Sequence, residues 1–269
     1  MREPRVSELG PPADWQGCEL DCASCPSSEL LGQHKCKLGW ACVHDRYAKR
    51  IDRFFFWNPE LAKDFLAHPY FEVRAVAARY VDVFHLPQMI NDNDETVRGS
   101  VATRLPTNQL LKLVHDPHRE VRIRVAARLA PHELRAMMHD PDYYVRQLVA
   151  RRISDVSLNL MMHDIDPGVR GVVASRIADA WLPAMALDAD AGVRREVARR
   201  MRPSQLHMLL DDLDWRVRYE VASRIDHYHL RRLVNDEDEL VRGLTHDRLN
   251  RTVGLADKLI TLSSAPRPA

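Results

Sequence analysis

Hydrophobic residues recur at a fixed interval along most of the chain. From about residue 60 to about residue 255, a valine returns every 24 residues, eight times without a break. We number each valine position 0. In the first seven repeats apolar residues follow it at +4, +5 and +8, as Val125, Ala126 and Leu129 follow Val121. This spacing predicts an α-helix of about three turns with one apolar face. The valines are Val73, Val97, Val121, Val145, Val169, Val193, Val217 and Val241.

A second apolar group completes each of the first seven repeats. It falls at +13, +16 and +17, as Leu134, Met137 and Met138 do, after turn residues such as Pro106 and Pro131. The space left for it is one or two helical turns, which predicts a short helix or a 3₁₀ helix. No stretch alternates apolar and polar residues of strand-forming types, so we expect no sheet.

Charged residues also occupy fixed positions in the repeat. Arginine at +1 falls inside the apolar face of the predicted helix, where a charge needs a partner. We expect aspartates at −5 to supply it, in a ladder that joins adjacent repeats. Asp116–Pro117 and Asp140–Pro141 are expected to place an N-cap before a proline at the first helical position. The alternative is an arginine row that binds an acidic partner or nucleic-acid phosphates. Within each column the residues are spaced by 24. The +1 arginines run from Arg74 to Arg242 and the −5 aspartates from Asp92 to Asp236. Further arginines lie at +7, from Arg104 to Arg248.

The repeats at the two ends depart from the pattern, as capping repeats of solenoids do. The first carries Arg79 at +6, and the last has Thr245–His246 where others have valine and alanine. The aromatic run Phe54, Phe55, Phe56 and Trp57 is expected to cover the open end of the first repeat. We divide the chain into a flexible N-terminus (1–14), a cysteine-rich cluster domain (15–50), the solenoid (51–260) and a disordered tail (261–269).

Composition agrees with a helical protein, since aromatic residues make up only 7% of the chain and glycine is sparse. The net charge of +1 creates no strong field toward nucleic acid or an anionic membrane. No apolar run approaches the length of a membrane span, and the N-terminus lacks the apolar core of a signal peptide. These features predict a cytoplasmic location without membrane contact. The sequence contains no nucleophile elbow, H-E-x-x-H or phosphate loop, so an enzyme is not expected.

Five cysteines crowd into one short segment near the start. Cys22 and Cys25 form C-x2-C, Cys36 and Cys42 are separated by five residues, and Cys18 precedes them. In a reducing compartment such crowding favours a metal centre over disulfides. Zinc and an iron–sulfur cluster both suit this ligand set, and the wide second spacing favours the cluster slightly. A four-ligand site leaves one of the five thiols as a spectator.

Histidines offer further candidate ligands. His34 and His44 could replace one thiol, although surface histidines are the simpler interpretation. His115, His139 and His163 recur at −6 and could line one loop edge as a metal-binding ladder. A metal-binding role for these three histidines is the less favoured interpretation.

The whole pattern resembles the leucine-rich repeat variant (LRV) family. The Asp at −5 and the Val–Arg pair resemble the first half of the inner helix of a HEAT repeat, but the 24-residue period is too short for two full helices. The strand signature of ordinary leucine-rich repeats is also missing. The resemblance implies an all-α, right-handed superhelical solenoid of alternating α and short 3₁₀ helices. It is carried by all eight repeats.

A subset of LRV proteins has an N-terminal [4Fe–4S] domain with the pattern D-C-x2-C, then C-x-L-G-x-x-C-V. The segments Asp21–Cys25 and Cys36–Val43 match it. The resemblance therefore implies Cys22, Cys25, Cys36 and Cys42 as cluster ligands and Cys18 as the spectator. It also associates the chain with nitrogen-fixing bacteria.

Three functions remain open from the sequence. The first is a non-enzymatic scaffold that presents an extended repeat surface to a protein partner, with a cluster that stabilises or senses. The second is a redox or electron-transfer protein. The third is nucleic-acid binding through pairs such as Arg151–Arg152 and Arg199–Arg200, although the exposed column at +2 repeats no chemistry that could read bases.

Overall fold

The computed structural model describes residues 10–263, and side chains as far as residue 251. Residues 1–9 and 264–269, which include most of the two termini expected to be flexible, lie outside the described residues. The chain folds into two compact units, one ending at Met137 and the other beginning at Met138.

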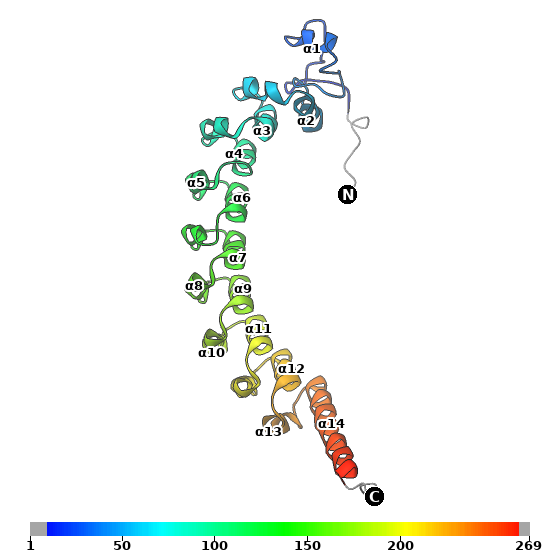
Figure 1. Ribbon diagram of the computed structural model, residues 1–269, viewed down its shortest axis with the longest axis vertical. Helices are drawn as coiled ribbons and strands as arrows, with labels where there is room; N and C mark the ends of the chain where they lie inside the picture. The colour runs from blue at the N-terminus through cyan, green and yellow to red at the C-terminus, as the bar shows by residue number, and fades with distance from the viewer. Residues whose placement is uncertain (1–9, 264–269) are drawn as a thin grey trace, which may run out of the picture. The chain divides into compact units, whose positions relative to one another are not determined.

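Each repeat begins with an α-helix that starts two residues before the column-0 valine. In the first unit these helices are α3 (Phe71–Tyr80), α4 (Glu95–Ala102) and α6 (Arg119–Arg128). In the second they are α7 (Tyr143–Arg152), α9 (Pro167–Arg176), α11 (Ala191–Arg200), α12 (Trp215–Arg224) and α14 (Glu239–Ser263). Within each unit, consecutive long helices pack side by side (Figure 1).

The second half of each repeat is a short helical segment, as its length requires. In the first unit these segments are η3 (Val83–Met89), α5 (Thr107–Leu110) with η4 (Leu111–Leu113), and η5 (Glu133–Met137). In the second unit they are α8 (Asp155–Leu158) with η6 (Asn159–Met161), η7 (Asp179–Trp181) with α10 (Leu182–Met185), η8 (Pro203–Leu209), and α13 (His227–Leu230) with η9 (Arg231–Leu233). Residues 10–263 contain no strand, only isolated bridges between Ala13 and Glu19 and between Lys37 and Ala41. The all-α fold of alternating α and 3₁₀ helices is therefore confirmed.

The apolar columns form the core of each unit. In the repeat that begins with α7, Val145, Val149 and Ala150 from the long helix and Leu158 from the short one are completely buried. Met161 at +16 is 3% exposed. The methionines in these columns are thus packing residues, which fill irregular space between repeats.

The arginines at +1 and the aspartates at −5 form the expected ladder between repeats. Arg170 on α9 donates from Nε and Nη2 to both carboxylate oxygens of Asp188 in the next repeat, at 2.7 and 2.9 Å. Its Nη1 donates to the carbonyl oxygens of Asp164 and Ile165 in its own repeat. The same bidentate contact joins Arg74 to Asp92, Arg98 to Asp116, Arg146 to Asp164, Arg194 to Asp212 and Arg218 to Asp236.

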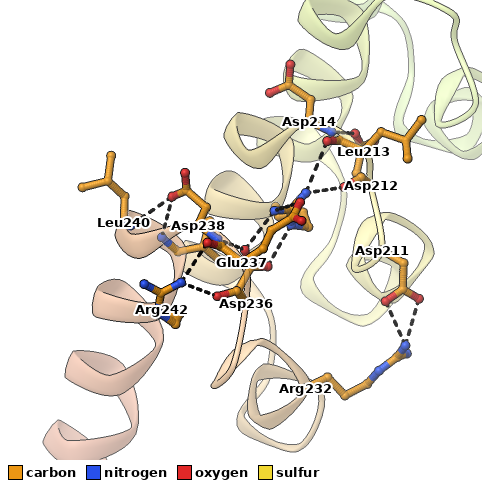
Figure 2. A network of polar contacts seen from close by, with 12 residues as sticks. Asp211, Asp212, Leu213, Asp214, Arg232, Asp236, Glu237, Asp238, Leu240 and Arg242 are labelled. Atoms are coloured by element: carbon orange, nitrogen blue, oxygen red, sulfur yellow. Dashed lines mark hydrogen bonds and ion pairs between the residues drawn. The ribbon is translucent and has the colours of Figure 1, made fainter.

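Figure 2 shows the last rungs of this ladder. Arg242 on α14 donates to the carbonyl oxygens of Asp236 and Glu237, and Arg232 pairs separately with Asp211. Because each rung uses the full fork of a guanidinium, the ladder fixes the spacing of successive repeats as well as their charge balance.

The aspartate at −5 is not the helix N-cap, so that expectation is wrong. The cap lies two residues later: His118 stands at the N-cap of α6 and Asp142 at that of α7, where the Asp142 carboxylate accepts the N–H groups of Tyr144 and Val145. The Asp140 side chain accepts the N–H of Asp142, which turns the backbone into the helix. Proline at −4 therefore lies in this turn, before the first helical residue.

The arginines at +7 close the end of the preceding helix. Arg176 donates to the carbonyl oxygens of Ala150 and Ile153 at the C-terminus of α7, at 2.6 and 3.0 Å. These carbonyls have no partner inside their own helix, and a positive charge there also complements the helix dipole. Equivalent bonds are made by Arg104, Arg128, Arg200, Arg224 and Arg248.

The ladder predicts how stability depends on pH. The hydrogen bond from Arg218 holds the pKa of Asp236 below its ordinary value of 3.8, against the opposing effect of partial burial. A depressed pKa in the folded state stabilises the protein above the ordinary value, and this contribution is lost as the pH falls through the folded-state pKa. Thermal unfolding followed by circular dichroism should show little change from pH 7 to about 5 and a steep loss below about pH 4. A flat profile to pH 3 contradicts the ladder, and Asp82→Asn, at an exposed carboxylate, should leave the profile unchanged.

Helix α2 (Ala48–Trp57) and the 3₁₀ helix η2 (Pro59–Phe65) cover the first repeat. Phe54 and Phe55 are completely buried, and the Phe55 ring lies 5.6 Å from that of Phe65 and 6.2 Å from that of Tyr80 on α3. Phe56, in contrast, is 71% exposed and Trp57 39% exposed. The expectation that all four aromatic residues cover the repeat is therefore wrong for these two, because a helix turns consecutive side chains onto different faces.

Two substitutions in α2 test whether its buried face seals the first repeat. Phe55→Ala should lower the free energy of unfolding by about 3 kcal/mol, since it leaves a cavity between the cap and α3. Phe56→Ala removes an exposed ring from the same helix and should change it by less than about 0.5 kcal/mol. Urea unfolding of the two variants measures the difference, and equal effects would show that Phe55 does not seal the repeat.

The last helix extends beyond the eighth repeat. α14 runs to Ser263, so residues 261–263, which we expected in the disordered tail, are helical. The stretch before them contains no proline and several good helix formers, which allows the helix to continue.

Candidate metal centre

The cysteine segment is a series of tight turns, each fixed by a local hydrogen bond. Asp14 accepts the N–H groups of Gln16 and Cys18, and Asp21 accepts the N–H of Ala23 around Cys22. The short helix α1 (Ser28–Gly32) follows Cys25. Aspartate is suited to such turns because its carboxylate bonds the backbone two residues on.

The C-x5-C loop is a narrow hairpin that brings Cys36 and Cys42 together. Lys37 and Ala41 pair through two backbone hydrogen bonds of 2.8 Å, and Gly39 at the tip has φ +68°. A side chain at Gly39 would be strained by this conformation, and its Cβ would lie 3.3 Å from Pro12. The glycine in the C-x-L-G motif therefore serves the turn between two cysteines.

Three buried polar residues anchor this hairpin to the cap. The Asn58 amide donates to the carbonyl oxygens of Lys35 and Phe54, at 2.7 and 2.8 Å, and so ties the residue before Cys36 to the end of α2. Asp45 and Arg50 form a buried ion pair at 2.9 Å, three residues after Cys42. The cluster domain is thus continuous with the cap of the first repeat.

The structure separates one cysteine from the other four. All five are free thiols, but Cys18 is exposed, whereas Cys22, Cys25, Cys36 and Cys42 are half-buried. Cys22, Cys25 and Cys42 line a hollow of about 250 Å³. Cys25 also accepts the N–H of Ser27 on its sulfur, at 3.3 Å.

The thiols of these four cysteines are electrostatically coupled. Burial, together with the charges of Cys22 and Cys25, raises the pKa of Cys36. Burial raises the pKa of Cys42 to about 11, with Asp45, Cys25 and Cys36 adding to the rise and the N–H of His44 opposing it. Without a cation the Cys36 and Cys42 thiols remain protonated at neutral pH, so a cation that binds them must displace their protons.

A solved structure shares this architecture. It is described as "a leucine-rich repeat variant with a novel repetitive protein structural motif", is 43% identical in sequence, and aligns with a TM-score of 0.80 over 85% of this chain and 98% of its own. The chain belongs to the leucine-rich repeat variant family. Residues 12–64 of this LRV protein also match a family model described as "LRV protein FeS4 cluster".

A second relative shares part of the LRV chain. It is the "Uncharacterized 27.7 kDa protein in nifB 3'region" of Rhodobacter capsulatus, 54% identical over 95 residues, which are 35% of this chain. The matched region covers 39% of that relative's own length. The family model implies an iron–sulfur cluster in residues 12–64, and the four coupled thiols supply a donor set that fits one, because such clusters are held by four thiolates.

Two histidines of the LRV protein lie against the same hollow. His44, three residues after Ala41, lies 3.3 Å from the Ser27 hydroxyl through Nε2, and His68 comes from the start of the first repeat. Burial lowers the pKa of both. His44 is a candidate ligand from the sequence, whereas His68 was missed; the sequence signal for His68 is its place at position −5 of the first repeat.

The remaining histidine candidates lie elsewhere. His34 is exposed in the turn after α1 and has φ +57°. His115, His139 and His163 are exposed on loops of the repeats. Within residues 10–263, no three His, Cys, Asp or Glu side chains already converge on a single metal ion. No helix in this same range combines the length and the apolar character needed to cross a bilayer.

Proposed function

We propose that Cys22, Cys25, Cys36 and Cys42 hold a [4Fe–4S] cluster and that Cys18 is not a ligand. The observation that carries this proposal is the electrostatic coupling of the four thiols, three of which line one hollow, with Cys18 exposed outside it. Zinc suits four thiolates as well, but the description of the matching family model favours the cluster.

The cluster would stabilise the fold as well as supply redox chemistry. Two of its proposed ligands lie on the turn before α1, and two on the hairpin that Asn58 anchors to the end of α2. Bound metal would therefore cross-link loops whose backbone is otherwise held by turns alone, and it would stabilise the cap of the first repeat. When bound, the cluster supplies one-electron redox chemistry.

We further propose that the repeat stack is a non-enzymatic scaffold for a protein partner. Both arginine columns are committed to carboxylates and carbonyls inside the fold, which argues against phosphate recognition along them. Loops of the second unit instead expose large apolar side chains: Ile165, Leu187 and Leu213 are 88%, 87% and 94% exposed. Exposed apolar side chains of this size suit a protein interface better than a nucleic-acid one.

A capture experiment under anaerobic conditions tests the scaffold. The full chain, with its cluster intact or removed, serves as bait in an extract of the source cells. Leu213→Asp should abolish capture of any specific partner without unfolding the protein, because the side chain has almost no contacts to lose. Val156→Asp, 91% exposed on a different column, is the matched control. A partner retained by both variants, or displaced by nucleic acid at low salt, contradicts the proposal.

An electron-transfer role is the second candidate. Trp15 and Leu38 line the hollow and are 45% and 41% exposed, which leaves the proposed cluster close to the surface. Reversible one-electron titration of the cluster supports this role, whereas a cluster that decomposes on reduction removes it. The nitrogenase-gene context in the name of the Rhodobacter relative makes a role in nitrogen fixation a working proposal for either function.

A further inference from the structure

His68 occupies a special place in the arginine–aspartate ladder. It stands at position −5 of the first repeat, where the seven later repeats have aspartate. Its backbone is held in the same way, because Arg74 donates to the carbonyl oxygens of His68 and Pro69 just as Arg98 donates to those of Asp92 and Asn93. His68 is therefore the first rung of the ladder with a different side chain.

The side-chain contact to the following turn is preserved as well. The N–H of Tyr70 donates to Nδ1 of His68 at 3.1 Å, as the N–H of Asp94 donates to Oδ1 of Asp92 at 2.9 Å. In Asp92 the other oxygen faces backward and accepts Nε of Arg74 in the preceding repeat. The corresponding atom of His68 is Nε2.

What precedes His68 is the cluster domain and not another repeat. Arg50, one period before Arg74, forms its buried ion pair with Asp45. His68 instead lines the hollow together with Cys22, Cys25 and Cys42, and its ring lies 6.3 Å from that of His44. Because Nδ1 accepts a hydrogen bond, the proton of the neutral ring is on Nε2, which makes His68 a donor where the other rungs are acceptors.

A hydrogen-bond donor at this position, in place of the aspartate acceptor of later repeats, suits a cluster because the thiolate and sulfide sulfurs of a cluster are acceptors. We propose that His68 donates its Nε2–H to a sulfur of the cluster and thereby joins the cluster to the first rung of the ladder. This inference rests on the proposed function, because it requires a cluster on Cys22, Cys25, Cys36 and Cys42. Hydrogen bonds to cluster sulfurs favour the more negative, reduced state and raise the reduction potential.

The test compares His68→Asn with the unaltered chain, both purified anaerobically. Asparagine can still accept the Tyr70 N–H through its oxygen, as Asp92 accepts that of Asp94, but its side chain is shorter than that of histidine and should not reach a bound cluster. Resonance Raman spectra in H₂O and D₂O report hydrogen bonds to cluster sulfurs without requiring reduction. The unaltered chain should show a deuterium shift of iron–sulfur bands, and His68→Asn should lose it and move the midpoint potential downward. His68→Gln, with a longer N–H donor, should recover part of both.

His139→Asn, at an exposed histidine of the repeats, is the control and should match the unaltered chain. An unchanged deuterium shift in His68→Asn with full iron and sulfide content overturns the inference. Loss of iron from His68→Asn while its circular dichroism is unchanged also overturns it, since His68 would then be a ligand. If the unaltered chain contains no iron and sulfide, the proposed function itself fails, so the two failures are distinguishable.

Discussion

Cys22→Ala should abolish the iron–sulfur absorption of the anaerobically purified protein, whereas Cys18→Ala should retain it in full. Cys22 lies beside the hollow and interacts electrostatically with Cys36, while Cys18 is exposed and its backbone is held in a separate turn by Asp14. Removing one of four thiolates leaves an incomplete ligand set, and a cluster rarely survives that loss. Iron and acid-labile sulfide analysis of the two variants measures the effect.

The same pair of variants tests the capping role. Hydrogen exchange in α2 and α3 should become much faster in Cys22→Ala, because the turn and the hairpin lose their shared metal centre, and should stay slow in Cys18→Ala. The opposite pattern, with cluster loss in Cys18→Ala and retention in Cys22→Ala, would show that Cys18 is a ligand and that Cys22 is the spectator.

Arg194→Ala should lower the free energy of unfolding by about 4 kcal/mol, a large effect for a side chain near the surface. Arg194 donates to both oxygens of Asp212, at 2.7 and 2.8 Å, and to the carbonyl of Asp188. The Asp212 side chain is only 4% exposed, so truncation of the arginine leaves a carboxylate with little water to replace its partner. Equilibrium urea unfolding measures the loss.

The neighbouring residue supplies the control. Arg195 is exposed on the same helix and has the same charge. Arg195→Ala should change stability by less than about 0.5 kcal/mol. Equal effects in the two variants would mean that the ladder contributes through net charge alone. A double change of Arg194 and Asp212 to apolar residues should recover much of the loss, because no buried charge then remains without a partner.

The sequence predicts the repeats because each column recurs in seven or eight of them. A period of 24 residues has room for one long helix and one short segment, and the buried position of Arg at +1 requires an anionic neighbour. The Arg170–Asp188 contact and its equivalents confirm this reasoning. The columns also exclude a sheet, in agreement with the described residues.

The position of the helix N-cap and the exposure of Phe56 could not be predicted from the repeat pattern. The N-cap falls at Asp142 and not at Asp140, because the side chain of Asp140 accepts the N–H of Asp142 in the turn before the helix, which a propensity for capping does not reveal. Phe56 is exposed because the exact start of α2 decides which of four consecutive aromatic residues face inward. In each case neighbouring residues are chemically alike, and the residue at which the helix begins decides which of them caps the helix or faces the core.

The residues of the candidate site could also be predicted only in part from the sequence. The cysteine spacing indicates a metal centre and leaves one thiol in excess, and exposure singles out Cys18. His68 is absent from any motif of the cysteine segment, since it lies in the first repeat, 26 residues beyond Cys42. The signal that could have found it is the −5 column, read as a substitution of the ladder aspartate.

Mössbauer spectroscopy of the ⁵⁷Fe-labelled, anaerobically purified chain, with metal and sulfide analysis of the same sample, shows which metal centre the four cysteines hold. We expect a [4Fe–4S] spectrum with about four iron and four sulfide per chain and negligible zinc. Stoichiometric zinc without sulfide, or iron that persists in the Cys22→Ala variant, would contradict it.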